Sequence, residues 1–318
     1  MTRPSIRRVE FDIDWPPGHV AAYVLDGDET ILFDAGATPW SGEPAPPFEE
    51  RAGYAPSEVD HVFLTHPHPD HVGHLRDLAA ESETTVYAPF SALDRRRRDP
   101  AAVEARTMEA LDASGLRGDE RAEVVEYEQQ MRSGLRECFP PDAVDEWVVD
   151  GQRVTVGGQA VDVVRTPGHH ADHVCYLTDV DGERSAFSGD MLVESFRAVL
   201  LNDRFDYEYR NAVGAFLRSL DRLEDAGVER AYPGHGPVHD DVTAVLERDR
   251  ESIARRVDGV REFLADGPAT PATVANALRG SHDLSYLLPE FASALAHLEN
   301  AGEAVTERAD EGTAYRLV

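Results

Sequence analysis

The stretch Thr65–Gly73 reads THPHPDHVG and directly follows the apolar run His61–Leu64. A β-strand points alternate side chains to one face, so histidines two positions apart can point the same way where a strand ends. Imidazole and carboxylate together suit zinc, iron or manganese. The stretch therefore predicts a metal site at a strand end, against the plainer interpretation of a polar loop with solvated histidines. Four potential ligands fall within six consecutive positions: His66, His68, Asp70 and His71.

Four other short motifs accompany this stretch along the chain. They are LFDAG at 32–36, TPGHHADH at 166–173, SGD at 188–190 and PGHG at 233–236. In this order, and together with H-x-H-x-D-H at 66–71, they resemble the signature of the metallo-β-lactamase superfamily. The resemblance is specific, because each ligand motif carries the turn glycine or proline that the family places beside it.

This resemblance implies an α/β fold, a four-layer αββα sandwich with its chemistry on loops at one edge of two packed sheets. It also implies two metal ions per chain, with zinc expected and iron or manganese as alternatives. Asp34 would orient ligand histidines from behind, whereas His173 is not counted as a ligand. Asp70 and Asp190 are the carboxylates expected to take part in catalysis. The implied ligands are His66, His68 and His169 for one ion and Asp70, His71 and His235 for the other, with Asp190 bridging.

The composition describes a globular protein with a strongly acidic surface. The 318 residues include 60 acidic and 31 basic ones, and the formal net charge is −29. Every basic residue is an arginine. Acidity combined with an absence of lysine suggests a halophile, where salt screens self-repulsion, although an acidic protein of an ordinary cytosol is the alternative.

The sequence predicts a cytoplasmic location and no membrane partner. The first residues contain no apolar signal segment, and no stretch approaches eighteen apolar residues. The two cysteines, Cys138 and Cys175, are far apart and fit structural thiols in a reducing compartment.

The catalytic domain is expected to span residues 1–245, with a helical insertion at about 90–145. Apolar residues recur at helical spacing within this insertion, which fits two or three helices. We interpret it as a lid over the metal site. The basic run Arg95–Arg98 at its start fits a solvated helix end balanced by nearby acids, with anion binding as the alternative.

Residues 246–318 are expected to form a C-terminal helix and a small winged-helix-like domain. Two helices, 271–278 and 286–300, precede two short strands around Gly312. From residue 266 onward this segment holds three arginines and eight acidic residues. A module of that charge is poorly suited to binding phosphates.

Four functions compete for this sequence. The first is hydrolysis of a small acyl ester or thioester by a metal-activated hydroxide, as in glyoxalase II, with a small-molecule substrate. The second is an endoribonuclease for single-stranded RNA, as in the lactamase-β-like branch with a winged C-terminal domain; nucleic acid is disfavoured but left open. The third is a single-iron sulfur dioxygenase, which would need only two histidines and one carboxylate. The fourth is a non-enzymatic docking or dimerisation role, and a homodimer is left open in any case.

Overall fold

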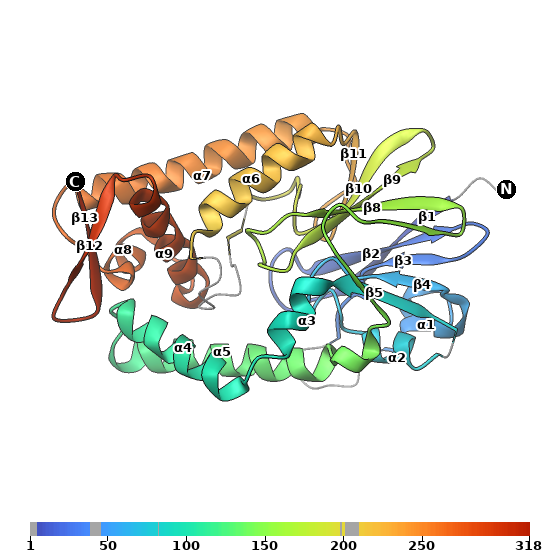
Figure 1. The fold of residues 1–318 in the computed structure, drawn as a ribbon, viewed down its shortest axis with the longest axis horizontal. Helices are drawn as coiled ribbons and strands as arrows, with labels where there is room; N and C mark the ends of the chain where they lie inside the picture. The colour runs from blue at the N-terminus through green and yellow to red at the C-terminus, as the bar shows by residue number, and fades with distance from the viewer. Residues whose placement is uncertain (1–4, 39–45, 82, 198, 201–209) are drawn as a thin grey trace.

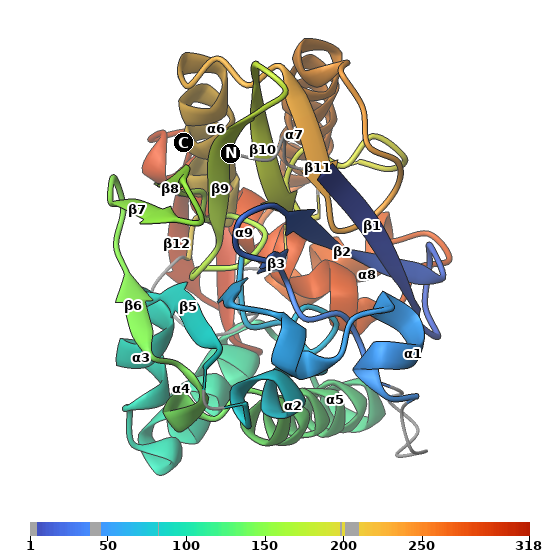
Figure 2. The same ribbon diagram turned by 90° about the vertical axis from the view of Figure 1, so that its right-hand side faces the viewer.

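The computed structural model describes residues 5–38, 46–81, 83–197, 199–200 and 210–318 (Figure 1). Two β-sheets pack face to face at one end of the molecule, helices cover their outer faces, and a small unit with the C-terminus lies at the other end (Figure 1). Figure 2 shows the layers: α6 and α7 above, the sheets between, and α2 and α5 below. The fold is the expected α/β sandwich with a small C-terminal hairpin sheet.

The first sheet has the strand order β1-β2-β3-β4-β5-β6. Its first pairs are antiparallel, and the pairs from β3 to β6 are parallel. The ends of β3 and β4 therefore lie at one edge, where the chain continues into Asp34 and then into the 65–73 stretch. The strands are β1 Ser5–Asp12, β2 His19–Asp26, β3 Ile31–Phe33, β4 His61–Phe63, β5 Thr85–Pro89 and β6 Glu146–Val148.

The second sheet has the order β11-β10-β9-β8-β7, antiparallel except for the parallel pair of β10 and β11. Parallel pairing brings the ends of β10 and β11 together, so SGD at 188–190 and PGHG at 233–236 lie side by side. The strands are β7 Arg153–Val156, β8 Gln159–Arg165, β9 Val174–Val180, β10 Glu183–Gly189 and β11 Arg230–Pro233.

Aromatic side chains fill the space between the two sheets. Phe63 stacks on Tyr87 at a ring-centroid distance of 4.3 Å and meets Tyr176 edge-on at 5.1 Å. Tyr176 is fully buried, and its hydroxyl donates to the Leu64 carbonyl at 2.8 Å. This bond joins the second sheet to the residue immediately before the metal-binding stretch, and it fixes where that stretch begins.

The outer helices bury apolar faces against the two sheets. Helices α6 (Ala212–Asp225) and α7 (Val242–Leu264) pack on the outer face of the second sheet, and α1 (Phe48–Ala52) and α2 (Leu75–Ala79) pack on the first. The Asn211 side chain caps α6 by accepting from the Gly214 N–H at 2.7 Å.

The insertion at 90–145 forms α3 Phe90–Arg96, α4 Pro100–Ala113 and α5 Gly118–Cys138, followed by a short 3-10 turn at Pro141–Ala143. Helices α4 and α5 run along the underside of the molecule from the sheets to the C-terminal unit (Figure 1). The turn between them is tied to that unit, since the Ala272 N–H donates to the Ser114 carbonyl at 2.8 Å. The insertion therefore makes contacts at both ends, and its role as a lid stays a prediction.

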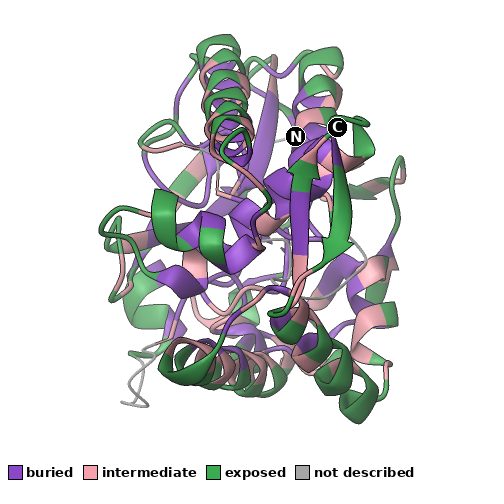
Figure 3. Cartoon of the chain, turned by 90° about the vertical axis from the view of Figure 1, so that its left-hand side faces the viewer, coloured by how far each residue is buried: buried purple, intermediate pink, exposed green. Residues whose placement is uncertain are grey.

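The C-terminal unit consists of α8 Pro271–Leu278, α9 Leu284–Asn300 and the hairpin β12 Ala304–Arg308 with β13 Thr313–Leu317. Its inner surfaces are buried; in the hairpin, β12 is largely exposed, whereas β13 is mostly buried or half-buried (Figure 3). The Thr270 side chain caps α8, and Asp283 caps α9. The order of helices and strands is the expected one, whereas the winged-helix assignment and the boundary at 245 stay predictions.

Some local expectations differ from the structure. The helical spacing of residues 71–78 predicts a helix from His71, but α2 begins only at Leu75, because residues 71–74 turn tightly around the site. Residues 37–55 are rich in Pro, Gly and Glu, which predicts a long loop, but α1 forms within this segment. The short strand β6 is a further element that the sequence does not predict. The apolar spacing of the segment 208–226 predicts a helix there, and α6 lies within that segment. Residues 208–209 of this segment and 39–45 of the loop lie outside the described residues. In the described part of the chain, no helix is long and apolar enough to cross a membrane.

Candidate metal centre

The seven residues expected to bind metal lie close together at the edge where both sheets present loops. His66 to His71 follow β4, His169 lies between β8 and β9, Asp190 follows β10, and His235 follows β11. All are buried except His68 and Asp190, which are partly buried. Their ligand atoms form two groups, each within 4.8 Å: His66, His68, His169 and Asp190 in one, and Asp70, His71 and His235 in the other.

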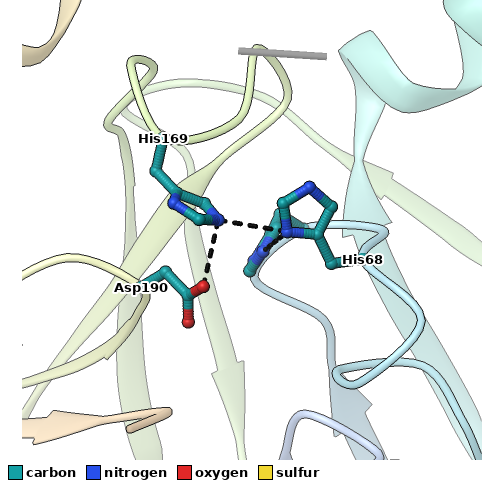
Figure 4. Close-up of side chains that lie close together, drawn as sticks. His68, His169 and Asp190 are labelled. Atoms are coloured by element: carbon teal, nitrogen blue, oxygen red, sulfur yellow. Dashed lines mark hydrogen bonds and ion pairs between the residues drawn. The ribbon is translucent and has the colours of Figure 1, made fainter. Parts of the chain in front are cut away.

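The donor atoms of the first group are about as far apart as two ligands of one tetrahedral metal ion. His68 Nδ1 lies 2.9 Å from His66 Nε2 and 3.1 Å from His169 Nε2, and the latter lies 3.0 Å from Asp190 Oδ2 (Figure 4). Nitrogens held about 2.0–2.1 Å from a zinc ion are about 3.3 Å from one another. The spacing of these donors therefore fits one small cation.

Asp190 joins the two groups. Its Oδ2 faces His169, and its Oδ1 lies 3.0 Å from His71 Nε2 and 3.4 Å from His235 Nε2. His235 Nε2 is also 3.4 Å from Asp70 Oδ2. One carboxylate oxygen thus belongs to each group, which is the geometry of a bridging ligand.

Hydrogen bonds on the outer side of the first group orient its rings. The Thr65 hydroxyl donates to Asp34 Oδ2 at 2.9 Å, so it accepts from His66 Nδ1–H at 3.0 Å. His169 Nδ1–H donates to the Val199 carbonyl at 3.2 Å. With their protons on Nδ1, both rings turn the lone pair of Nε2 into the site.

The second group is oriented in the same manner. His71 Nδ1–H donates to Asp34 Oδ2 at 2.8 Å, and His235 Nδ1–H donates to the His19 carbonyl at 2.8 Å. Both Nε2 lone pairs therefore face inward. His71 Nε2 and Asp190 Oδ1 are buried and lack a hydrogen-bond partner of good geometry, although they lie 3.0 Å apart. Several lone pairs and two carboxylates converge here, which is the chemistry of a cation site.

The pKa shifts of the proposed ligands are also those expected for a cation site. Burial, and then the charges of neighbouring histidines, hold the pKa of His66 and His68 well below the usual value, so both rings stay neutral. Burial opposes a charge on His71 too, but the carboxylates of Asp190 and Asp34 raise its pKa well above the usual value. The carboxylates therefore favour a positive charge in this buried site. A proton on His71 would supply that charge in the position where a metal cation fits.

Two glycines allow the backbone to approach these ligands. A Cβ at Gly234 would lie 2.6 Å from His71 Cε1. Gly189 has a φ of +49°, and a Cβ there would lie 2.6 Å from Thr65 Oγ1 and 2.8 Å from His173 Nε2. Glycine is required at both positions for that reason. The turn residues of the motifs are part of the site's geometry.

Several histidines near the site lie outside both groups. His173 Nε2 accepts from the Asp190 backbone N–H at 3.2 Å, so this ring holds the backbone of Asp190 in place. His74 packs against Phe11 with ring centroids 5.3 Å apart, and His19 contributes its carbonyl. The sequence could not predict the contact of His19 with His235, because it is made by a backbone carbonyl, which every residue has.

The run Arg95–Arg98 at the start of the insertion is also tied to the site. Arg95 Nε donates to Asp172 Oδ2 at 2.8 Å, and Asp172 is fully buried within the TPGHHADH loop. Arg98, just beyond the end of α3, lies 3.8 Å from Asp94 of that helix. Arg95 therefore anchors α3 to a ligand loop, a role that the sequence interpretation did not include.

A pocket opens beside the first group. Its described lining combines two ligands with apolar and charged side chains from the loop after Asp190 and from α7. The lining residues are His169, Asp190, Val193, Phe196, Arg197, Val199 and Asp249.

Replacing Asp34 by Asn should weaken metal binding by about 10- to 100-fold, the usual cost of losing an outer hydrogen-bond partner. Asp34 is buried with a φ of 61°, which Asn tolerates, so the backbone should persist. An Asn amide cannot accept from Thr65 and His71 on both of its terminal atoms. Titration with a competing chelator measures the affinity. The exposed Asp77→Asn serves as control, and equal affinities in both variants would show that Asp34 does not orient the ligands.

Comparison with known proteins places this geometry in context. The family model for the metallo-beta-lactamase superfamily matches residues 15–235. The chain is 24% identical to the probable metallo-hydrolase YqjP of Bacillus subtilis over 99% of this chain and 98% of that protein. It is 32% identical over 117 residues to an atrochrysone carboxyl ACP thioesterase of Aspergillus chevalieri, covering 36% of this chain and 34% of that protein.

Solved structures share the fold over the full length of the chain. A beta-lactamase domain protein of Burkholderia ambifaria superposes with a TM-score of 0.79 at 21% identity, covering 100% of this chain and 93% of that one. The chain aligns with about two thirds or less of the length of several curated relatives.

Proposed function

Since the chain belongs to the metallo-β-lactamase superfamily, we propose that it is a metal-dependent hydrolase that cleaves a small acyl ester or thioester at a dinuclear zinc centre. The observation that carries the proposal is the convergence of two His/Asp groups on Asp190 beside a partly apolar pocket. Iron or manganese in place of zinc would preserve the reaction class, since imidazole and carboxylate bind all three.

The chain's own residues prepare the site for hydrolysis. His66, His68 and His169 would hold one cation and Asp70, His71 and His235 the other, with Asp190 between them. When bound, two such cations act as Lewis acids and lower the pKa of a water toward about 7, which supplies a nucleophile at neutral pH. Asp70 and Asp190 offset part of the positive charge, while Asp34 and the backbone carbonyls keep the imidazole lone pairs pointed inward.

Two observations support an acyl substrate. Val193, Phe196 and Val199 give the pocket an apolar wall suited to an acyl chain. The thioesterase of Aspergillus chevalieri provides a relative, by its name, with this type of substrate.

The second candidate is cleavage of single-stranded RNA, which the order of helices and hairpin after α7 favours. Charge argues against it, because residues 266–318 hold three arginines against eight acidic residues. A dioxygenase with one iron would use fewer ligands than the seven that converge here. We therefore propose a small molecule as the partner, in a cytoplasmic protein.

The substrate class can be tested on purified enzyme in high salt. We expect S-acyl thioesters to be hydrolysed faster than single-stranded RNA is cut, and the thioesterase activity to be abolished by His68→Ala. The exposed Arg255→Gln is the matched control and should retain full activity. RNA cleavage that is lost in His68→Ala, with no esterase or thioesterase activity, would reverse the order of the two candidates.

A further inference from the structure

Arg197 brings a positive charge to the pocket beside the metal ligands. It is the cationic side chain among the described lining residues, and the same lining includes the ligands His169 and Asp190. Arg197 lies in the loop that follows Asp190, outside every motif of the sequence. Its side chain is 36% exposed, whereas the ligands around it are nearly buried.

A buried glutamate from the C-terminal unit holds this arginine. Glu290 of α9 is 1% exposed, and Arg197 Nη1 donates to both of its oxygens, at 3.1 and 3.2 Å. Arg256 of α7 donates to the same carboxylate from the other side, and its guanidinium lies 5.4 Å from the centre of the Phe291 ring. Two arginines therefore share one carboxylate.

The single carboxylate of Glu290 thus faces two guanidinium groups. Burial, and then the neighbouring charge of Arg197, lower the pKa of Arg256 to about 9, so Arg256 still carries its proton at neutral pH. Asp249, which also lines the pocket, is engaged by Arg248 at 2.7 Å. Arg256 is only 14% exposed, so Arg197 is the member of the pair that meets solvent in the pocket.

We propose that Arg197 recognises an anionic group, a carboxylate or a phosphate, on the substrate, and that Glu290 positions it for this purpose. The proposal rests on the proposed acyl hydrolase function and names the charge of the substrate. A guanidinium is suited to both anions through its planar fork of donors. A guanidinium in the pocket also distinguishes anionic from neutral substrates on a chain whose net charge is −29.

Paired substrates test the proposal and identify the source of the anion. Succinyl and butyryl thioesters of N-acetylcysteamine differ in a carboxylate on the acyl group. Butyryl-4′-phosphopantetheine and butyryl-pantetheine differ in a phosphate on the thiol. We expect the wild type to prefer the charged member of one pair, which identifies a carboxylate or a phosphate as the recognised group.

Arg197→Gln should remove that preference. We expect kcat/KM for the charged member to fall about 10- to 100-fold, as for a lost hydrogen bond to a charged group, while the neutral member changes less than about threefold. Arg197→Lys keeps the charge but loses the planar fork of donors, so its preference for the charged substrate should lie between those of the wild type and Arg197→Gln. The Lys variant also controls for misfolding of the Gln variant. Metal content should be the same in all three proteins, and the exposed Arg255→Gln is the matched control.

A binding measurement separates this proposal from the proposed function. Calorimetric titration of metal-loaded enzyme with succinate or inorganic phosphate should show at least about tenfold weaker binding of one of them in Arg197→Gln. If no ester or thioester is hydrolysed but this difference appears, the proposed function fails and Arg197 remains an anion-binding residue. Equal binding of both anions by both proteins, with no charge preference in the wild type, would overturn the role of Arg197.

Discussion

Replacing Asp190 by Asn should reduce turnover by at least about 100-fold and leave fewer than two metal ions per chain, whereas the unaltered protein should contain about two. Asp190 is the side chain common to both groups, with one oxygen 3.0 Å from His169 Nε2 and the other 3.0 Å from His71 Nε2. An amide has no charge and only one acceptor atom, so it cannot serve both ions. A loss of three to four kcal/mol in transition-state stabilisation corresponds to about 10²- to 10³-fold in rate.

Elemental analysis of protein purified without chelator, together with the rate on the best acyl substrate, measures both effects. The exposed Asp240→Asn is a suitable control, because its carboxylate pairs with Arg230 away from the metal centre. Full activity and two ions in Asp190→Asn would exclude the bridging role. A single iron in the wild type would instead favour the dioxygenase alternative.

The metal centre could be predicted from the sequence because its chemistry is local. The ligands lie in short motifs at strand ends, and each motif carries the glycine or proline that its turn requires, as Gly234 beside His71 shows. The sheets were predictable for a related reason, since their buried strands have apolar runs bounded by turn residues.

The pocket could not be predicted in the same way. Arg197 and Glu290 are 93 positions apart in the chain, and neither lies in a motif. Only packing of α9 against the loop after Asp190 brings them together, and that packing depends on the three-dimensional path of the insertion and α7. Arg95 illustrates the same limit, because its buried partner Asp172 is 77 positions away and looks like an ordinary motif residue in the sequence.

One peptide group links the C-terminal unit to the metal centre. The Leu200 N–H donates to Glu290 Oε1 at 3.3 Å, and the Val199 carbonyl of the same peptide accepts from His169 Nδ1 at 3.2 Å. Glu290 thus fixes the group that orients a proposed ligand, in addition to holding Arg197. The C-terminal unit therefore helps to position residues of the site, and this role does not depend on nucleic-acid binding.

Replacing Glu290 by Gln should therefore lower the free energy of unfolding by about 3–5 kcal/mol, since it leaves the largely buried Arg256 without its counter-charge. Metal affinity should also fall, by about tenfold, because a neutral amide oxygen replaces the anionic acceptor that holds the peptide orienting His169. Urea unfolding and chelator titration measure the two effects, with the exposed Glu307→Gln as control at less than about 1 kcal/mol.

The double variant Glu290→Gln with Arg256→Met distinguishes an electrostatic cause from lost packing. Removing the arginine that is left unpaired should recover at least half of the unfolding free energy, because a methionine fills similar volume without a charge. The metal affinity should not recover, since Arg256→Met does not restore the anionic acceptor for the Leu200 N–H. If stability stays low in the double variant, the loss comes from packing around α9; if metal affinity returns, the link from Glu290 through the Val199–Leu200 peptide to His169 is wrong.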